Sequence, residues 1–378
     1  MNLVIVFGND HTNSVGVIQS LGLAGYSSIG LLFGDRTGYV LASKYTQRVI
    51  SGSDPQTCID ELLKCSFDSK TRIPIVACCD IAALTLEKNA ERLKERFVFG
   101  YASNHSLDFM AKKENQVKMA AQAGFNVPKS WNLSERKEIP SDVIFPCLIK
   151  PLVSCEGAKS DIRVCYTREE LERNLNSLNF TKKVLLQQYI DRDYEISILG
   201  CGITNGTCLI PVIENKLTLY PKYVGLECLA NMQKLTDKEI ISNISNLIKS
   251  IGYVGLFSVE MMHCKTDGKF YFTEINLRND GAESFVTKYG ANLPLNHVED
   301  LMGLPLTKQK EECPGFYIWD MHHLKSFLCG DISFFTWIKE ICRSKGFLMY
   351  FPEDKKPFFQ QYFYMLKKFF KRKKTLKY

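Results

Sequence analysis

The chain has 378 residues, of which 45% are hydrophobic and 24% charged, ordinary values for a soluble globular protein of two or three domains. Its longest apolar runs, such as Leu3 to Phe7, have the length of a strand, which excludes a membrane span of roughly 20 residues. The N-terminus enters that strand without a basic region or a cleavage site, so we expect no signal peptide.

The net charge of +7 is unevenly distributed. The segment from Lys355 to Tyr378 has nine Lys or Arg residues and no Asp or Glu, which leaves −2 for the rest of the chain. The fourteen cysteines are scattered and form no CxxC pair, which is typical of free thiols in a reducing cytosol and not of a disulfide framework or a zinc site. The sequence therefore indicates a cytoplasmic protein with a basic tail.

The first hundred residues alternate between strand and helix patterns. Strands are predicted at 2–8, 27–33 and 72–80, and helices at 15–26 and 81–97. This alternation predicts an α/β fold with an open, mostly parallel sheet.

The middle of the chain is richer in strands. After a helix at 106–125 we expect strands at 142–151 and 183–190, a hairpin at 153–166, a helix at 167–178, a β-meander at 192–214 and a helix at 236–253. Two strands then follow within 255–277, joined by a turn at Asp267-Gly268. No period of about 20 to 50 residues repeats, which excludes a solenoid.

The last two of these strands carry a group of oxygen-bearing side chains. Glu274 and Asn276 share a face because side chains alternate along a strand. If the register places Glu260 of the preceding strand on that face, two carboxylates and an amide form a site suited to Mg²⁺, with Arg278 beside it to neutralise phosphate. The alternative is a set of solvated strand-edge acids with an Arg partner.

Two further features favour a nucleotide. Lys113 and Lys150 lie on separate elements, and each can act as a point charge toward a polyphosphate. The segment "LLQQYIDRDYE" is a strand that leads into an exposed connector, whose backbone groups can read an adenine edge. Glu195 ends this segment and can accept hydrogen bonds from ribose hydroxyls.

The order of the segments "KK…GFNVP", "FPCLIKP", "VLLQQYIDRDYE", "VEMM" and "FTEINLR" resembles the ATP-grasp ligases, from about Ser106 to Gly303. The N-terminal part is similar to the Rossmann-like pre-ATP-grasp domain of that superfamily. The segments "GVIQSLGLAGY", "SKYTQRVI" and "CCDIAALTLEKNAERL" resemble the carboxylate–amine ligase branch, which includes D-aspartate ligases and carbamoyl-phosphate-synthase-like proteins.

The resemblance implies a role for each matching residue. Lys113 and Lys150 would bind the ATP phosphates, Gln187 would meet the adenine amino group, and Glu195 would hold the ribose. Gln188, Tyr189 and Ile190 belong to the adenine hinge, where backbone groups of Gln188 and Ile190 would read the base. Glu260, Glu274 and Asn276 would bind Mg²⁺ or Mn²⁺, and Arg278, with Lys150, would act in catalysis.

The implied architecture has three parts. A Rossmann-like pre-ATP-grasp domain at 1–105 precedes an ATP-grasp domain at 106–305, whose clamp subdomain spans about 141–188. A helical C-terminal extension with the basic aromatic tail occupies 306–378. This chain departs from the family in having Leu277 where proline is common, and in having one glycine in the phosphate-covering loop Ser154–Ser160.

The implied reaction joins a carboxylate and an amine at the expense of ATP, by way of an acyl-phosphate. The substrate would be an amino acid or a cell-envelope precursor. Two alternatives stay open: an ATP-binding protein without ligase turnover, acting in a surface-polysaccharide or envelope system, and a kinase-like enzyme that stops at phosphorylation. The oligomeric state does not follow from the sequence.

Other motifs have weaker interpretations. The loop at 7–16 lacks the glycines of a dinucleotide fingerprint, which excludes NAD, and Asn9, Asp10 and His11 are expected to form its turn or to touch substrate. His322 and His323 are interpreted as surface or packing residues. The tail predicts an amphipathic helix that either contacts an anionic membrane, at the inner face of which the protein would sit, or packs on the body. No motif accompanies the charge that would indicate nucleic-acid binding.

Overall fold

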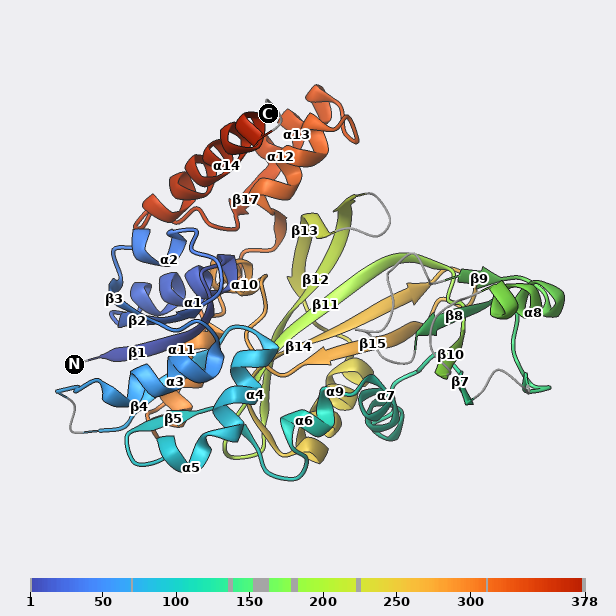
Figure 1. Cartoon of the computed structure of the whole chain (residues 1–378), viewed down its shortest axis with the longest axis horizontal. Helices are drawn as coiled ribbons and strands as arrows, with labels where there is room; N and C mark the ends of the chain where they lie inside the picture. Colours follow the sequence, from blue (N-terminus) through green and yellow to red (C-terminus); the bar gives the residue numbers. More distant parts are fainter. Residues whose placement is uncertain are drawn as a thin grey trace.

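The computed structural model describes residues 2–68, 71–134, 139–151, 163–177, 183–221, 226–310 and 312–375. These residues form three sheets with helices around them (Figure 1). Among them, no helix combines the length and the apolar character that crossing a membrane requires.

The N-terminal sheet is parallel and has the strand order β3-β2-β1-β4-β5. Its elements are β1 (Leu3–Asn9), α1 (Thr12–Leu23), β2 (Ser27–Phe33), α2 (Tyr39–Ala42), β3 (Thr46–Ser51), α3 (Pro55–Lys64), β4 (Ile73–Ala77), α4 (Asp80–Lys88), α5 (Ala90–Leu93) and β5 (Phe97–Phe99). From β1 the chain adds β2 and β3 on one side of the sheet and then crosses to add β4 and β5 on the other side. The loops after β1 and β4 therefore border a crevice, and open α/β sheets bind ligands in such a crevice.

A small antiparallel sheet of order β7-β10-β8-β9 follows. This part contains β6 (Tyr101–Ala102), α6 (Leu107–Met110), α7 (Lys113–Gln122), β7 (Ser130–Ser134), β8 (Cys147–Pro151), β9 (Arg163–Cys165), α8 (Arg168–Ser177) and β10 (Lys183–Gln188). Its own small core includes Ile149, Leu171 and Leu186. The phosphate-covering loop at 154–160 lies outside the described residues.

The largest sheet has the order β15-β14-β11-β12-β13-β16-β17, and β6 also pairs with β14. Its elements and the helices between them are β11 (Arg192–Gly202), β12 (Cys208–Tyr220), β13 (Leu226–Lys234), α9 (Lys238–Ile251), β14 (Tyr253–Cys264), β15 (Phe270–Asn276), α10 (Glu283–Tyr289), α11 (Leu293–Leu301), β16 (Gly315–Ile318) and β17 (Ser344–Phe347). Helix α9 packs on one face through Ile244, Leu247 and Ile251, which are buried at helical spacing.

The C-terminal region is helical, as the sequence predicts, and contains α12 (Asp320–Leu328), α13 (Phe334–Arg343) and α14 (Lys356–Thr375). In Figure 1 these helices lie above the N-terminal sheet. A buried carboxylate fixes this arrangement, because Asp354 accepts hydrogen bonds from the Ser43 hydroxyl (2.6 Å) and the Lys44 N–H (3.0 Å). Strands β16 and β17 of the same region extend the largest sheet at its edge.

Helix α14 packs on the body with one face and exposes the other. Phe358 contacts Tyr350 (ring centroids 5.3 Å apart), and Tyr364 contacts Tyr39 (5.8 Å). Phe359 and Phe363 point outward and are more than 60% exposed. Packing on the body is therefore observed for one face of the tail helix, and the other face is available for a partner.

Two predicted helices are each divided into two. The helix expected at 81–97 breaks at Asn89, whose side chain bonds the Thr85 carbonyl and thereby competes with the helical pattern. The helix expected at 106–125 breaks near Lys112, which becomes the N-cap of α7. This break places Lys113 at the start of a helix.

Candidate active site

The oxygen-bearing side chains of the last two strands lie in one row across the largest sheet. Glu260 of β14 pairs with Glu274 of β15 on one side and with Ser197 of β11 on the other. Ser197 in turn pairs with Glu214 of β12. Residues directly opposite one another project from the same face, so four neighbouring strands contribute to a single polar row. Glu260 lies within β14, four residues before its end.

Two carboxylates of this row, Glu274 and Glu260, each face a cation. Lys113 Nζ lies 3.2 Å from Glu274 Oε2, and Lys216 Nζ lies 3.1 Å from Glu260 Oε2. Asn276 Nδ2 is 3.5 Å from Glu274 Oε1. The predicted metal-binding residues Glu260, Glu274 and Asn276 are thus together, and Lys113 reaches them from another helix.

The electrostatics of Glu260 are those of a site with surplus negative charge. Burial raises its pKa, Lys216 opposes that shift, and the neighbouring Asp280 and Glu274 add to it. A divalent cation would offset this surplus, and the two carboxylates with an amide oxygen are the hard donors that Mg²⁺ accepts. Within the described residues no group of three or more His, Cys, Asp or Glu side chains is placed to hold a metal alone, so phosphate and water oxygens would have to complete the shell.

Arg278 is fixed at the end of β15 by two carboxylates. It lies 3.1 Å from Asp280 and 3.4 Å from Asp80, and its side chain is largely buried. Burial opposes the ionisation of Asp280, but the charge of Arg278 and hydrogen bonds from the Ala282 N–H and the Ser258 hydroxyl hold its pKa below the usual value. Ion pairs with Asp280 and Asp80 therefore hold the guanidinium beside the row without any contact to phosphate.

The two predicted ATP lysines approach each other. Lys150 Nζ is 2.7 Å from Gln187 Oε1, and the amide nitrogen of Gln187 is 3.1 Å from the Ser130 hydroxyl. Burial lowers the pKa of Lys150, and the charge of Lys113 lowers it further. The small sheet and α7 thus direct two cations toward one region.

Two backbone N–H groups of the predicted adenine hinge already donate hydrogen bonds to neighbouring segments of the chain. The N–H of Gln188 donates to the Lys129 carbonyl (2.8 Å), and the N–H of Tyr189 donates to the Pro146 carbonyl (2.9 Å). The expectation that the backbone of Gln188 reads the base therefore applies to its carbonyl and not to its N–H. Ile190 is buried beside them, and Glu195 forms an ion pair with Arg192.

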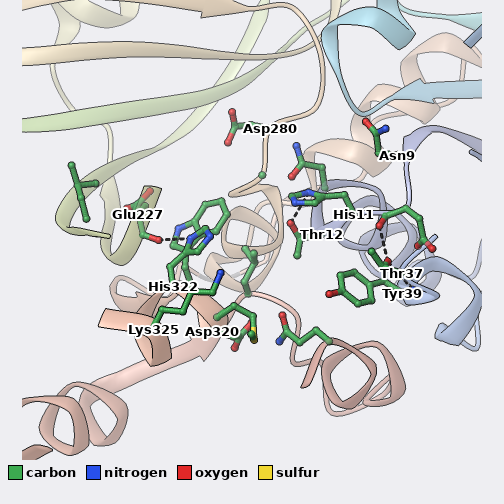
Figure 2. A pocket seen from close by; sticks show the side chains of 18 of the residues that line it. Asn9, His11, Thr12, Thr37, Tyr39, Glu227, Asp280, Asp320, His322 and Lys325 are labelled. Carbon is green, nitrogen blue, oxygen red and sulfur yellow. Dashed lines mark hydrogen bonds between the residues drawn. The ribbon is translucent and has the colours of Figure 1, made fainter. Parts of the chain in front are cut away.

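A cavity of about 1200 Å³ opens beside the polar row. Its sheet side includes Glu195, Ser197, Glu214, Lys216, Glu227, Glu260, Glu274 and Asp280, and its opposite side comes from the loop after β1 and from α12 and α14. Figure 2 shows His11 and Thr12 of that loop facing His322 and Lys325 across the cavity. The predicted residues Lys113, Lys150 and Gln187 to Ile190 do not line it.

Sequence reasoning missed several residues of this cavity. His322 lines it and bonds the Glu227 carbonyl (2.9 Å), a position that the interpretation of His322 and His323 as surface or packing residues does not indicate, and His323 is buried against Glu340. Asp10 is used locally, accepting bonds from the N–H groups of Gly38 and Val40, which agrees with a turn role. Lys216, Glu214 and Glu227 carry no motif and become visible only through the sheet register.

A known domain family and several known proteins resemble this chain in sequence. Residues 118–287 match the model of the ATP-grasp domain. The formate-dependent phosphoribosylglycinamide formyltransferase of Bacillus velezensis is 27% identical over 205 residues, which are 51% of this chain and 50% of that protein. The D-aspartate ligase of Enterococcus faecium is 22% identical over 266 residues, 62% of this chain and 59% of the other. The chain thus spans about half the length of the curated relatives it matches.

A solved structure has the same fold. The N5-carboxyaminoimidazole synthetase of Staphylococcus aureus, crystallised with ADP, superposes with a TM-score of 0.64 at 14% identity, covering 83% of this chain and 81% of that one. At this identity the likeness shows the fold alone. Residues 118–287 of this chain match the ATP-grasp domain model, and the described part of the chain has the fold of this synthetase.

Proposed function

We propose that this protein is an ADP-forming ligase that joins a carboxylate to an amine. The observation that supports it most is the row Glu274–Glu260, with Asn276 beside it and Lys113 on Glu274, at the mouth of a large cavity. Two relatives act, by name, on formate and on D-aspartate, both of which carry a carboxylate. An amino acid or a cell-envelope precursor is the substrate class that we propose.

In this proposal Glu260, Glu274 and Asn276 hold Mg²⁺ or Mn²⁺, which would offset phosphate charge during transfer. Lys113 would exchange its ion pair with Glu274 for the phosphates once the metal neutralises that carboxylate. Lys150 and Arg278 would neutralise charge that develops on the transferred phosphoryl group. Gln187, the backbone groups of Gln188, Tyr189 and Ile190, and Glu195 would bind the adenosine. Residues 1–105, 106–305 and 306–378 would form the three parts of the enzyme.

The chemistry requires no side-chain nucleophile. An oxygen of the substrate carboxylate forms a bond to the γ-phosphorus of ATP, and the bond to the ADP oxygen breaks. The neutral amine then attacks the carbonyl carbon of the acyl-phosphate, and phosphate leaves with the electron pair of the carbon–oxygen bond. The nitrogen loses one proton as the amide forms, and the departing phosphate takes it up. Water must be kept from this intermediate, because it would hydrolyse it.

A screen for ADP release tests this proposal. The protein would be incubated with ATP, Mg²⁺ and pairs of amino acids and other carboxylates, beside a Glu274→Gln variant and a Glu61→Gln control on the exposed face of α3. We expect release that needs both a carboxylate and an amine, and that Glu274→Gln reduces by at least about 100-fold. ATP binding without release would favour the non-enzymatic alternative, and a stable phosphorylated product would favour a kinase.

We also propose that the protein is cytoplasmic and contacts an anionic membrane through α14. The outward face of this helix exposes Phe359, Phe363 and Leu366, and the segment from Lys355 onward is basic throughout. Each basic residue near an anionic surface contributes about 1 kcal/mol to attraction. Co-sedimentation with phosphatidylglycerol vesicles should be lost in Phe363→Glu and retained in Tyr166→Glu, an equally exposed aromatic on another element. Equal binding of both variants would refute this contact.

A further inference from the structure

Two neighbouring strands, β12 and β13, each place a buried glutamate in the cavity that the proposed ATP and metal sites do not use. Glu214 of β12 and Glu227 of β13 are 1% and 7% exposed, and both line the cavity. The Oε1 atom of each is buried without a hydrogen-bond partner in the part of the chain that the structure describes. Buried polar atoms are nearly always paired in native proteins, so two unpartnered carboxyl oxygens from residues that line one cavity point to a ligand.

The charges around these two carboxyls do not balance. Lys216 is committed to Glu260 at 3.1 Å, and Arg278 is committed to Asp280 and Asp80. Burial raises the pKa of both carboxyls, that of Glu227 to about 8, and the charge of Lys216 opposes these shifts without cancelling them. The charge of Glu227 raises the pKa of Glu214 further. A cation bound by the two groups would offset this charge.

The position of Glu214 and Glu227 suits the molecule that attacks the acyl-phosphate. Glu214 stands in the same cross-strand row as Glu260, with Ser197 between them. Because neighbouring strands are about 4.8 Å apart, Glu214 lies about 10 Å along the row from Glu260. A small molecule anchored at Glu214 can therefore reach a carbonyl carbon held above the metal ligands.

The surrounding wall is aromatic and close-packed. Trp319 stacks with His322 at a ring separation of 5.9 Å, and both line the cavity. Figure 2 shows His322 beside Glu227 and Asp280 across from them. A Cβ on Gly281 would lie 2.7 Å from the Trp319 ring, so this wall has no room for a side chain there. Aromatic faces next to carboxylates favour an organic ammonium over a bare metal ion.

We propose that Glu214 and Glu227 form the subsite for the ammonium group of the amine substrate, which is then a protonated aliphatic primary amine such as the α-ammonium of an amino acid. A carboxylate of the pair accepts one proton from the bound ammonium, which frees the nitrogen lone pair for attack on the acyl-phosphate. This inference rests on the proposed ligase function. A second divalent metal is a poorer occupant, because the described residues offer no third carboxylate, His or Cys in a metal-binding arrangement with the pair.

A comparison of hydroxylamine with the amine substrate distinguishes a role of Glu214 and Glu227 in binding the amine from a role in activating the carboxylate. Hydroxylamine is largely uncharged at neutral pH and traps an acyl-phosphate as a hydroxamate without needing an ammonium subsite. With the carboxylate and amine found in the screen, Glu214→Gln and Glu227→Gln should keep hydroxamate formation within about twofold and raise the KM for the amine about 10- to 100-fold. Glu91→Gln, an exposed glutamate on α5, is the control.

The outcomes are distinct. An unchanged KM for the amine in both Gln variants overturns the subsite while the ligase function stands. An equal loss of hydroxamate and amide also overturns it, because the pair would then serve ATP or the metal. If no carboxylate supports hydroxamate formation in the unmodified protein, the ligase function itself fails.

A binding measurement decides the matter without turnover. Rb⁺ resembles ammonium in size and charge and gives an anomalous X-ray signal. Crystals of the full chain soaked in RbCl should show a peak between Glu214 and Glu227, and crystals of the Glu214→Gln/Glu227→Gln variant should lack it. A peak in neither crystal, or the same peak in both, overturns the assignment of these two carboxylates as the cation-binding groups.

Discussion

Replacing Glu227 by glutamine should stabilise the protein while impairing its reaction. Burial raises the pKa of this carboxyl from 4.5 to about 8. Between these two values the folded state binds a proton that the unfolded state has lost, so the Glu227 contribution to the free energy of unfolding decreases as pH rises. The penalty is absent below pH 4.5 and complete near pH 8.

The structure sets the size of this effect. The difference between 4.5 and about 8 corresponds to an upper limit of about 5 kcal/mol at pH 8, since each unit is worth about 1.4 kcal/mol. Neutral replacements of buried ionic groups stabilise by about 1–4 kcal/mol in practice, and we expect about 2 kcal/mol for Glu227→Gln at pH 8.

Chemical denaturation at several pH values, without nucleotide or metal, measures this prediction. The difference between Glu227→Gln and the unmodified protein should grow steadily from pH 5 to pH 8. Glu91→Gln, whose side chain is 86% exposed, should differ from the unmodified protein by less than about 0.5 kcal/mol throughout. A destabilised Glu227→Gln at pH 8, or a difference that does not shrink on acidification, would show that Glu227 carries no buried charge at that pH.

Three other perturbations test the packing around the site. Lys216→Met leaves Glu260 without its buried partner and should lower the free energy of unfolding at neutral pH by about 3 kcal/mol, measured by urea unfolding; no loss would contradict the ion pair. Gly281→Ala brings a methyl group within 2.7 Å of Trp319, so tryptophan fluorescence should shift and the KM for the amine should rise; an unchanged spectrum would argue against that contact. Asp354→Asn weakens the bonds that join the C-terminal region to the N-terminal part and should increase cleavage of α14 by trypsin several-fold, whereas equal cleavage would show that the docking depends on other contacts.

Much of the fold can be inferred from local patterns. The strand–helix alternation of the first hundred residues predicts the parallel sheet that the structure shows, and the two strands joined at Asp267-Gly268 are observed as β14 and β15. The alternation of side chains along a strand is also sufficient to place Glu274 and Asn276 on one face. These inferences succeed because each depends on neighbours within a few residues.

The positions of the remaining site residues depend on strand pairing that is not visible in a local stretch of sequence. Glu214 joins the polar row only through the register of β11 with β12, and Glu227 belongs to β13, a strand that the sequence pattern does not indicate. His322 reaches the cavity because β16 pairs with β13 and α12 follows it. Each of these residues is isolated in the sequence, and no local period or motif distinguishes it from a solvated residue.

The fate of the carboxylate oxygen shows whether the reaction passes through an acyl-phosphate. With a substrate carboxylate labelled with ¹⁸O in both oxygens, a reaction through an acyl-phosphate transfers one labelled oxygen to phosphate, because the bond between carbon and the bridging oxygen breaks when the amine attacks. We predict that the inorganic phosphate released with amide product carries one ¹⁸O per molecule by mass spectrometry. Phosphate without label, formed along with the amide, would contradict activation of the carboxylate by ATP.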